Sequence, residues 1–175
     1  MKHKVKYISA EDLDIFDGLI CYSESREPFT GVYFSCHGNG QVGEEVEVKA
    51  GRRHGLLKMY NEEGVQIVEA HFDQGVKHGK LTLWYDNGVK KSELTLVRGR
   101  REGKMKVWYE NGSLKITGFY HDDMLHGTQR KYFPSGKLRM QVDFREDVEH
   151  GRKTIWDEKG KILFEGRYFN GTPHS

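Results

Sequence analysis

The stretch Gly103–His126, GKMKVWYENGSLKITGFYHDDMLH, decides the fold, because its pattern returns along the chain every 24 residues. One glycine opens each copy, at Gly31, Gly55, Gly79, Gly103, Gly127 and Gly151. A second glycine follows nine positions after each of these, and a third column holds Gly51, Gly75, Gly99, Asp123, Asp147 and Gly171. A fixed period with no insertion or deletion is the signature of a repeat architecture.

Each copy has the pattern of one β-hairpin. In the fourth copy Leu114, Ile116, Gly118 and Tyr120 alternate with Ser113, Lys115, Thr117 and Phe119, and this period of two is typical of half-buried strands. Sequences such as Asn111-Gly112 between the two strands supply the positive φ that two-residue hairpin turns need. Because all connections are short, neighbouring strands should be antiparallel. We therefore expect an all-β fold: an elongated, single-layer, twisted antiparallel sheet.

The pattern divides the chain into two regions. Residues 31–175 contain six repeats, at 31–54, 55–78, 79–102, 103–126, 127–150 and 151–174. Residues 1–30 do not fit the pattern, and we interpret them as a tail and an N-terminal cap, since the terminal units of a solenoid must close its core. The segment Gly18–Tyr22 should be a short strand of this cap, whereas residues 1–14 fit either a frayed tail or a cap strand.

Aromatic residues occupy two columns of the repeat. The first column follows the opening glycine by five residues, and we predict that its members are structural and stack between repeats: Tyr60, Trp84, Trp108, Tyr132 and Trp156. The second column closes the second strand, at Phe72, Leu96, Tyr120, Phe144 and Tyr168. Two residues before it the side chains are mostly small, as at Gly118, which leaves room for a large neighbour.

The composition limits the classes of function. The formal net charge is +2, which is too near neutral for a nucleic-acid partner, and the densest basic cluster, Arg98, Arg100 and Arg101, is better explained as a solvated loop than as a phosphate site. Two cysteines make no disulfide framework, and the chain has no apolar run of signal-peptide or transmembrane length. We therefore expect a cytoplasmic protein without a transmembrane segment.

Catalytic and metal-binding patterns are not found. His54, His78, His126 and His150 share one repeat position, but equivalent residues one repeat apart lie about 9–10 Å apart, too far to share a metal. The carboxylate row Glu45, Glu69, Glu93 and Glu165 has the same spacing and makes poor acid–base pairs. Neither a nucleophile elbow nor a phosphate-binding glycine loop is present. We expect no enzyme activity, no metal and no cofactor.

The pattern G-x4-[WY]-[YF]-x-N-G, with the alternating strand after it, resembles the MORN repeat. It is most similar to the bacterial variant found in antitoxin and immunity proteins, and the entry segment Glu27–Gly31, EPFTG, resembles the way that variant opens its array. The resemblance covers residues 27–171 and implies a single-layer twisted sheet of hairpins. The first repeat departs from it, since Cys36 and His37 replace the aromatic pair.

A single-layer sheet has two faces to cover, so apolar residues on the face opposite the first aromatic column need a cover of their own. We therefore predict a protein-binding surface made of Leu81, Leu83, Tyr85, Met105, Val107 and Tyr109, with Arg98, Arg100 and Arg101 beside it. The family resemblance suggests an antitoxin or immunity protein that binds a cognate toxin. The alternative is a structural scaffold or membrane-apposed adaptor that binds anionic lipid or another protein. Pairing of exposed end strands would give a homodimer.

Overall fold

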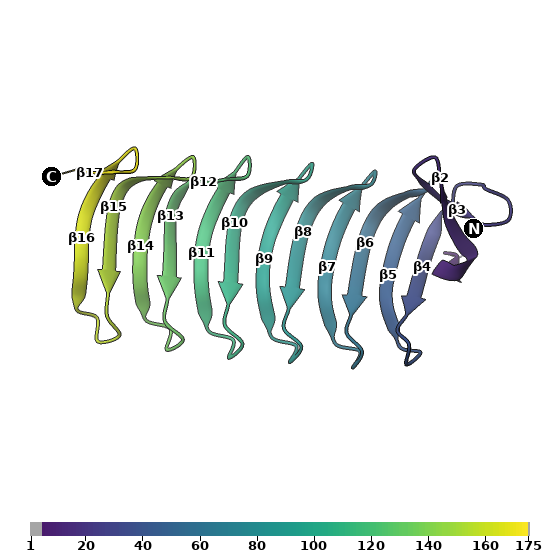
Figure 1. Ribbon diagram of the computed structural model, residues 1–175, viewed down its shortest axis with the longest axis horizontal. Helices are drawn as coiled ribbons and strands as arrows, with labels where there is room; N and C mark the ends of the chain where they lie inside the picture. The colour runs from purple at the N-terminus through teal and green to yellow at the C-terminus, as the bar shows by residue number, and fades with distance from the viewer. Residues whose placement is uncertain (1–4, 175) are drawn as a thin grey trace. The chain divides into compact units, whose positions relative to one another are not determined.

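The computed structural model describes residues 5–174, and the chain divides into two compact units between Gly88 and Val89. Apart from one 3-10 turn, η1 (Ala10–Asp12), the regular structure of the described residues consists of strands. In each unit consecutive hairpins form a single layer (Figure 1). The predicted all-β class and the predicted antiparallel hairpin sheet are confirmed.

The first unit contains a sheet in the order β1-β4-β5-β6-β7-β8 and a separate hairpin of β2 and β3. Its strands are β1 (Tyr7–Ser9), β2 (Leu13–Phe16), β3 (Leu19–Tyr22), β4 (Gly31–Cys36), β5 (Val42–Lys49), β6 (Arg52–Tyr60), β7 (Gln66–Asp73) and β8 (Val76–Trp84). The strand predicted at Gly18–Tyr22 is β3. Of the two alternatives for residues 1–14, the strand holds for Tyr7–Ser9, while residues 1–4 lie outside the described part.

The second unit continues the hairpin pattern in the order β9-β10-β11-β13-β14-β15-β16-β17, with β12 paired to β11. Its strands are β9 (Lys90–Val97), β10 (Arg100–Trp108), β11 (Leu114–His121), β12 (Met124–Leu125), β13 (Gly127–Tyr132), β14 (Leu138–Arg145), β15 (Val148–Trp156), β16 (Ile162–Phe169) and β17 (Thr172–His174). The pairs within this unit are antiparallel, as expected. In the first unit, β1 runs parallel to β4, which the prediction of antiparallel neighbours did not include.

The two ends of a hairpin use different turns, and the prediction assigned the two-residue turn to the wrong end. At Asn111-Gly112 only the glycine has positive φ, and the loop is closed by Gly112 N–H to Tyr109 O and Tyr109 N–H to Ser113 O, both 2.9 Å. This is the longer type I turn with a bulged glycine. The two-residue turns lie at the other end, where both residues have positive φ, as at Arg98 (51°) and Gly99 (84°).

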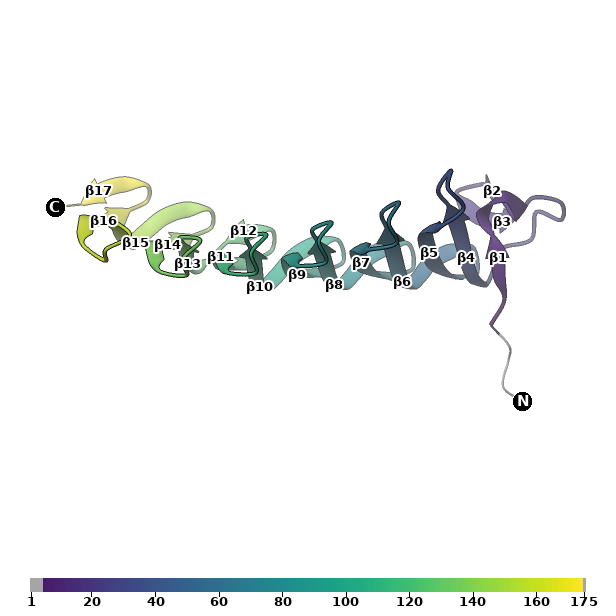
Figure 2. The same cartoon turned by 90° about the horizontal axis from the view of Figure 1, so that it is seen from below.

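Four of the opening glycines lie inside strands, at bulges, whereas Gly31 and Gly127 begin β4 and β13 as the pattern suggested. Between the pairs Val142–Lys153 and Phe144–Glu149, the single residue Asp143 lies opposite three residues of β15 that include Gly151. The Asp143 carboxylate accepts a hydrogen bond of 3.0 Å from Arg152 N–H. Such bulges bend strands and increase their twist. The curled hairpins of each unit are visible end-on in Figure 2.

Cross-strand register places the side chains in rows, and a polar row occupies one face of the sheet. In the second unit it consists of successive pairs formed by Glu93, Lys106, Thr117, Arg130, Gln141, Thr154 and Glu165. In the first unit the same row is Glu45, Lys58, Glu69 and Thr82. Opposite charges directly across a ladder stabilise it by about 0.2–1 kcal/mol each. The predicted row of carboxylates flanked by lysines is thus a polar ladder, with opposite charges paired at Glu45–Lys58–Glu69 and Glu93–Lys106 and buried threonines at Thr82 and Thr154.

The opposite face carries an inner row that forms the core. It includes Val46, Leu57 and Ala70 in the first unit and Met105, Gly118 and Val142 in the second. Apart from Gly118, each of these residues is at most 8% exposed. The space above Gly118 is filled as predicted, since a Cβ there would lie 3.7 Å from Met105 Cε and 3.5 Å from Leu125 Cδ2. In the first unit Phe29 is fully buried beside this row. Val48 and Leu96, two residues further along their strands, are also buried and widen the core.

Hydrogen bonds between turns link successive hairpins within each unit. The second residue of a two-residue turn donates its N–H to a carbonyl 22 positions earlier, as Gly75 does to Arg53 (2.8 Å), Asp123 to Arg101 (3.0 Å) and Gly171 to Glu149 (2.9 Å). The turns are therefore fixed by their neighbours, which explains why aspartate can replace glycine at a position with φ of 71°.

Two glycine substitutions test the role of the bulge. Gly151→Ala should lower the free energy of unfolding by about 1–3 kcal/mol, because φ is 118° and the new Cβ would lie 2.8 Å from Asp143 Cβ. Gly118→Ala should be neutral or stabilise by up to about 1 kcal/mol, since its Cβ meets only ordinary contacts. Urea unfolding of both variants measures the difference, and equal stabilities would contradict the assigned role of the bulge.

Candidate interaction surface

A second apolar row lies beside the inner row on the same face and is more exposed. In the second unit it consists of successive pairs from Val107 through Ile116, Lys131, Met140 and Ile155 to Phe164. In the first unit it consists of Met59, Val68 and Leu83. We call these residues the outer row. Met59 is 38% and Phe164 39% exposed, and the other members are half-buried. The outer row therefore offers apolar area that the chain itself does not cover.

The structure separates the apolar residues that were predicted to bind a partner. Leu83 and Val107 belong to the outer row, whereas Met105 is 8% exposed in the inner row and Leu81 is half-buried opposite Ala70. Since Met105 fills the core over Gly118, its side chain offers little area to a partner. Only the outer-row members of the predicted set have the exposure that a binding surface requires.

The predicted tyrosines lie at the end of the hairpins where the longer turns are. Tyr109 is half-buried, its hydroxyl donates a 2.8 Å hydrogen bond to Tyr132 O, and Lys115 Nζ lies 5.1 Å from its ring centroid. Tyr85 occupies the equivalent position after β8 and is also half-buried. Tyr109 thus connects one hairpin to the next, and only part of its ring remains available to a partner.

The basic cluster is paired with acidic residues of the next turn. Arg100 lies 2.9 Å from Asp122, and Arg101 Nε lies 2.9 Å from Asp123 Oδ1 while its guanidinium covers the Tyr120 ring at 4.1 Å. The carboxylates raise the pKa of both arginines, chiefly through these hydrogen bonds, and Arg101 lowers the pKa of Asp123. Arg98 lies in the preceding two-residue turn. These contacts favour the structural explanation of the cluster over a phosphate site.

Two members of the first aromatic column, Tyr60 and Trp108, lie on the same side of the sheet as the polar row. Tyr60 OH donates a 3.0 Å hydrogen bond to Glu45, and Lys90 Nζ lies 5.4 Å from the Trp108 ring while it also binds Glu93 at 2.8 Å. The column and the apolar rows therefore occupy opposite faces, as the alternation indicated. Its members are half-buried. Their stacking between repeats remains a prediction.

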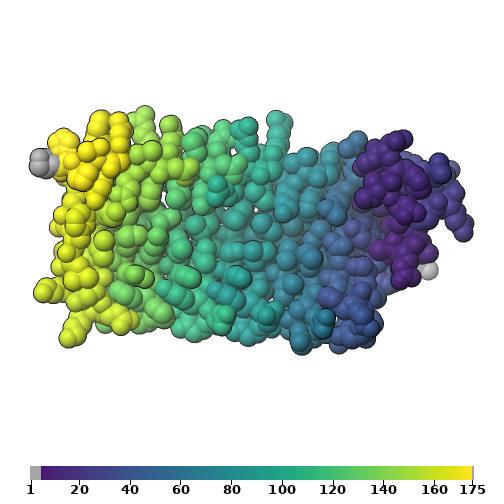
Figure 3. All heavy atoms as spheres, viewed as in Figure 1, coloured from purple at the N-terminus to yellow at the C-terminus, as the bar shows by residue number. Residues whose placement is uncertain are grey.

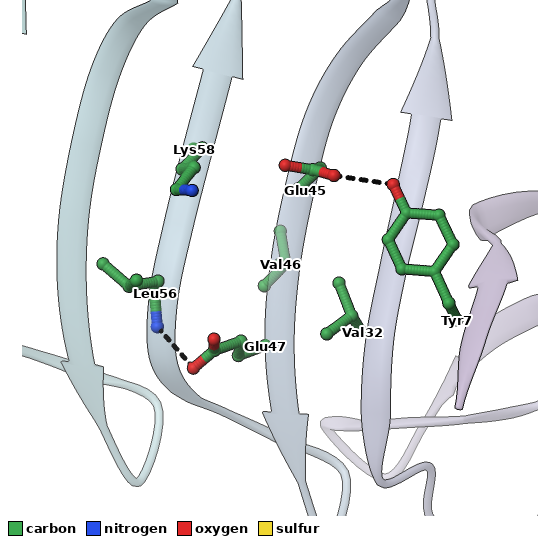
Figure 4. Close-up of a pocket in the computed structure, with 7 residues that line it drawn as sticks. All are labelled: Tyr7, Val32, Glu45, Val46, Glu47, Leu56 and Lys58. Atoms are coloured by element: carbon green, nitrogen blue, oxygen red, sulfur yellow. Dashed lines mark hydrogen bonds between the residues drawn. The ribbon is translucent and has the colours of Figure 1, made fainter. Parts of the chain in front are cut away.

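A small hollow lies at the first-unit end of the polar face (Figure 4). It has a volume of about 180 Å³ and is lined by Tyr7, Val32, Glu45, Val46, Glu47, Leu56 and Lys58. Glu45 accepts hydrogen bonds from Tyr7 OH at 2.6 Å and from Tyr60 OH at 3.0 Å. Its carboxylate also lies across the ladder from Lys58. Both oxygens of Glu45 are therefore engaged by the chain's own side chains.

The carboxylate of Glu45 keeps both tyrosines protonated. The hydrogen bond to Glu45, with burial and the negative charge as lesser causes, raises the pKa of Tyr7 to about 12. For Tyr60, burial is the largest cause and the hydrogen bond to Glu45 the second, and its pKa is also raised to about 12. A phenol with a raised pKa stabilises the fold at pH values below its unfolded pKa of about 10, and this contribution is lost as the pH rises through 12.

The side-chain contacts of the histidine column are local: His150 is hydrogen-bonded, whereas His54 Nδ1 lies close to a carboxylate without a hydrogen bond. His54 Nδ1 lies 3.2 Å from Asp73 Oδ1, and His150 Nδ1 lies 3.2 Å from Asn170 Oδ1. Between β10 and β11 the acidic residue and the histidine change places: Glu102 occupies the histidine position, and its partner is His121 at 3.1 Å. That contact raises the pKa of His121. Among residues 5–174 no group of three or more histidine, cysteine or carboxylate side chains converges as a metal site would require.

Sequence reasoning missed three features. The Tyr7–Glu45 bond depends on the parallel pairing of β1 with β4, which no repeat pattern signals. The arginine–aspartate pairs had a signal, since their 22-residue spacing equals that of the turn hydrogen bonds. The separation of inner from outer rows also depends on how far each bulge bends its strand, and the alternation itself does not show this.

Comparison with known families finds a match to three segments of the chain. Residues 77–97, 101–122 and 125–146 match the family model described as MORN repeat variant. Each match begins two residues before an opening glycine and includes its bulge. MORN repeats are in general modules that bind proteins or membranes. The sequence matches no curated protein. No helix in the described part of the chain is long and apolar enough to cross a membrane.

Replacing Glu45 tests the tyrosine cluster. Glu45→Gln should lower the pKa of Tyr7 and of Tyr60 from about 12 toward 10, because the negative charge and the charged acceptor are both removed. Tyrosinate absorbance in a pH titration, with Tyr7→Phe and Tyr60→Phe to assign the two transitions, measures this shift. A wild-type chain in which both tyrosines titrate near 10 would contradict the assigned hydrogen bonds.

Proposed function

We propose that this chain is a non-catalytic protein-binding repeat module whose outer row docks against a partner protein. The observation that carries the proposal is the row itself: five apolar side chains, interrupted by Lys131 on β13, follow one another on one face of the second unit from Val107 to Phe164 and stay partly exposed. Rows of this kind exceed the scattered apolar exposure of ordinary surfaces. Extended surfaces built over several repeats are the usual binding sites of solenoids.

The chemistry of the polar face supports a non-catalytic role. Its carboxylates lie across the ladder from lysine or threonine, and Glu45 is also bonded to two tyrosines. The ladder therefore serves register and solubility, and binding is assigned to the opposite face.

The particular role we propose is that of a cytoplasmic antitoxin or immunity protein that neutralises a cognate toxin by binding it. This part of the proposal is supported by the resemblance of the repeat pattern to the bacterial variant found in such proteins. The partner would be the product of a neighbouring gene. Growth of cells that produce this gene product, with and without the present chain, tests the role: survival only with the chain supports it, and equal killing contradicts it.

Membrane contact is the second candidate, because MORN repeats also occur as membrane-binding modules. Two residues of the basic cluster, Arg100 and Arg101, already pair with Asp122 and Asp123. Flotation with vesicles that contain phosphatidylserine, at low salt, distinguishes the two candidates. We expect no co-flotation, and binding that disappears at high salt would favour the lipid.

A pair of substitutions on one strand locates the binding face. Ile116→Lys should weaken binding of the neighbouring gene product at least tenfold, because it buries a charge in the centre of the outer row. Phe119→Lys makes the same kind of change on the polar face, at a side chain that is 39% exposed, and should change Kd less than twofold. Titration calorimetry measures both values. The reverse order of effects would place the binding site on the polar face.

If Ile116→Lys lowers the melting temperature, Met140→Lys provides a second test in the outer row. Circular dichroism shows whether each variant keeps its fold. Binding unchanged in both folded variants would overturn the proposal.

A further inference from the structure

A lysine interrupts the outer row of the second unit. Its strand β13 pairs with β11 and β14, so Lys131 lies directly between Ile116 and Met140 on the face that carries both apolar rows. The equivalent positions of the other five repeats are uncharged and mostly apolar: Ser35, Met59, Leu83, Val107 and Ile155. This chain therefore places a positive charge where its other repeats place a neutral side chain.

The ammonium group of Lys131 has no counter-charge in the described part of the chain. The residue is half-buried, and no ion pair or hydrogen bond within residues 5–174 engages its side chain. Its neighbours on this face, Ile116 and Met140 across the ladder and Gln129 along its own strand, are uncharged. A lysine in such a place can lay its stem on apolar neighbours and keep its ammonium in water. Solvent therefore satisfies this charge in the free chain.

Two other cations on this face of the second unit have acidic partners within the chain. Lys153 of the inner row lies 2.7 Å from Glu149. Arg101, opposite an inner-face residue of β9, lies 2.9 Å from Asp123. The fold thus neutralises these two charges and leaves that of Lys131 open.

The second unit as a whole also carries an excess of positive charge. Residues 89–175, coloured teal to yellow in Figure 3, contain 18 lysines and arginines against 12 aspartates and glutamates, a formal charge of +6. Residues 1–88 contain 10 against 14, a formal charge of −4. Complementary charge steers the approach of a partner, so the unit with the longest part of the outer row favours an acidic one.

A partner that covers the outer row must also cover Lys131. Contact with both Ile116 and Met140 encloses the lysine, because it lies between them. Enclosing an ammonium without an anion is costly, whereas a carboxylate opposite it forms a charge-assisted hydrogen bond. A wholly apolar partner surface is therefore disfavoured relative to one in which an acidic side chain lies between apolar ones.

We propose that Lys131 determines the specificity of the outer row, by binding a carboxylate that lies between apolar side chains in a segment of the partner protein. The inference rests on the proposed function, since it requires the outer row to bind a protein. In the complex, Ile116 and Met140 contact the apolar side chains of this segment, and Lys131 Nζ donates to its carboxylate.

Selection from a phage-displayed library of random peptides tests the proposal without a known partner. The full chain is the bait, and Ile116→Lys, or Met140→Lys if that variant loses its fold, removes peptides that bind elsewhere. We expect the remaining peptides to carry Asp or Glu flanked by apolar residues. Selection on Lys131→Glu should enrich Lys or Arg at that place instead.

The outcomes of this selection separate the two proposals. Outer-row peptides without an acidic residue, or the same peptides from both baits, would overturn the role of Lys131 and leave the proposed function standing. If every selected peptide binds the outer-row variant as well as the full chain, the outer row does not bind protein segments, and both proposals fail.

The affinity of one selected acidic peptide, measured by titration calorimetry, tests the charge pair. Lys131→Met should raise Kd about tenfold or more and reduce the salt dependence of binding, because it removes the charge and keeps a long side chain. Lys104→Met makes the same change at an exposed position of the polar face and should change Kd less than about twofold.

Charge exchange distinguishes a direct contact from a defect in the fold. Lys131→Glu should lose the peptide and regain binding when the acidic residue of the peptide is replaced by lysine, which a damaged strand would not do. Circular dichroism checks the fold of each variant. A Lys131→Met chain that binds as tightly as wild type or more tightly would overturn the proposal, since the lysine would then lie outside the contact.

Discussion

The constraint on which this structure depends is that each unit is a single layer, so its sheet must bury its own apolar side chains. The bulge at the opening glycine helps to meet this constraint, because a bulge bends its strand and increases its twist. Glu47 and Asp143 stabilise the bulge by accepting hydrogen bonds from Leu56 and Arg152. A period of 24 residues therefore repeats more than hairpins: it repeats the bend that gives the sheet a core.

The same constraint explains why apolar residues on one face have different roles. Residues nearest the bend are buried, as Val142 is at 1% exposure, and they hold the fold together. Residues nearer the longer turns, such as Val107 and Phe164, lie where the sheet does not cover itself and stay partly exposed. The opposite face carries polar and charged residues, with some opposite charges paired across the ladder, and these favour one register and solvation. In this proposal the inner row provides stability, the outer row binds a partner and the polar row favours solubility. Each row extends over several repeats.

Much of this architecture was predictable, because repetition shows each column of the pattern several times. The alternation of Leu114, Ile116 and Gly118 fixed the strand and its faces, and the histidine column was correctly read as local. The exchange of the two turn types was not predictable from Asn111-Gly112 alone, since the same dipeptide fits both turns. Pairing of β1 with β4 joins residues outside the pattern, and the burial of Met105 relative to Val107 depends on the bend. The sequence therefore predicted only some of the residues of the candidate surface.

The central claim is that the inner row holds the fold while the outer row is free for binding. Two neighbouring truncations on β10 test it most directly, by chemical unfolding of the isolated chain. Met105→Ala should lower the free energy of unfolding by about 2–4 kcal/mol, because it opens a cavity beside Gly118, whereas Val107→Ala should cost about 1 kcal/mol or less. A loss for Val107→Ala equal to or larger than that for Met105→Ala would contradict the account.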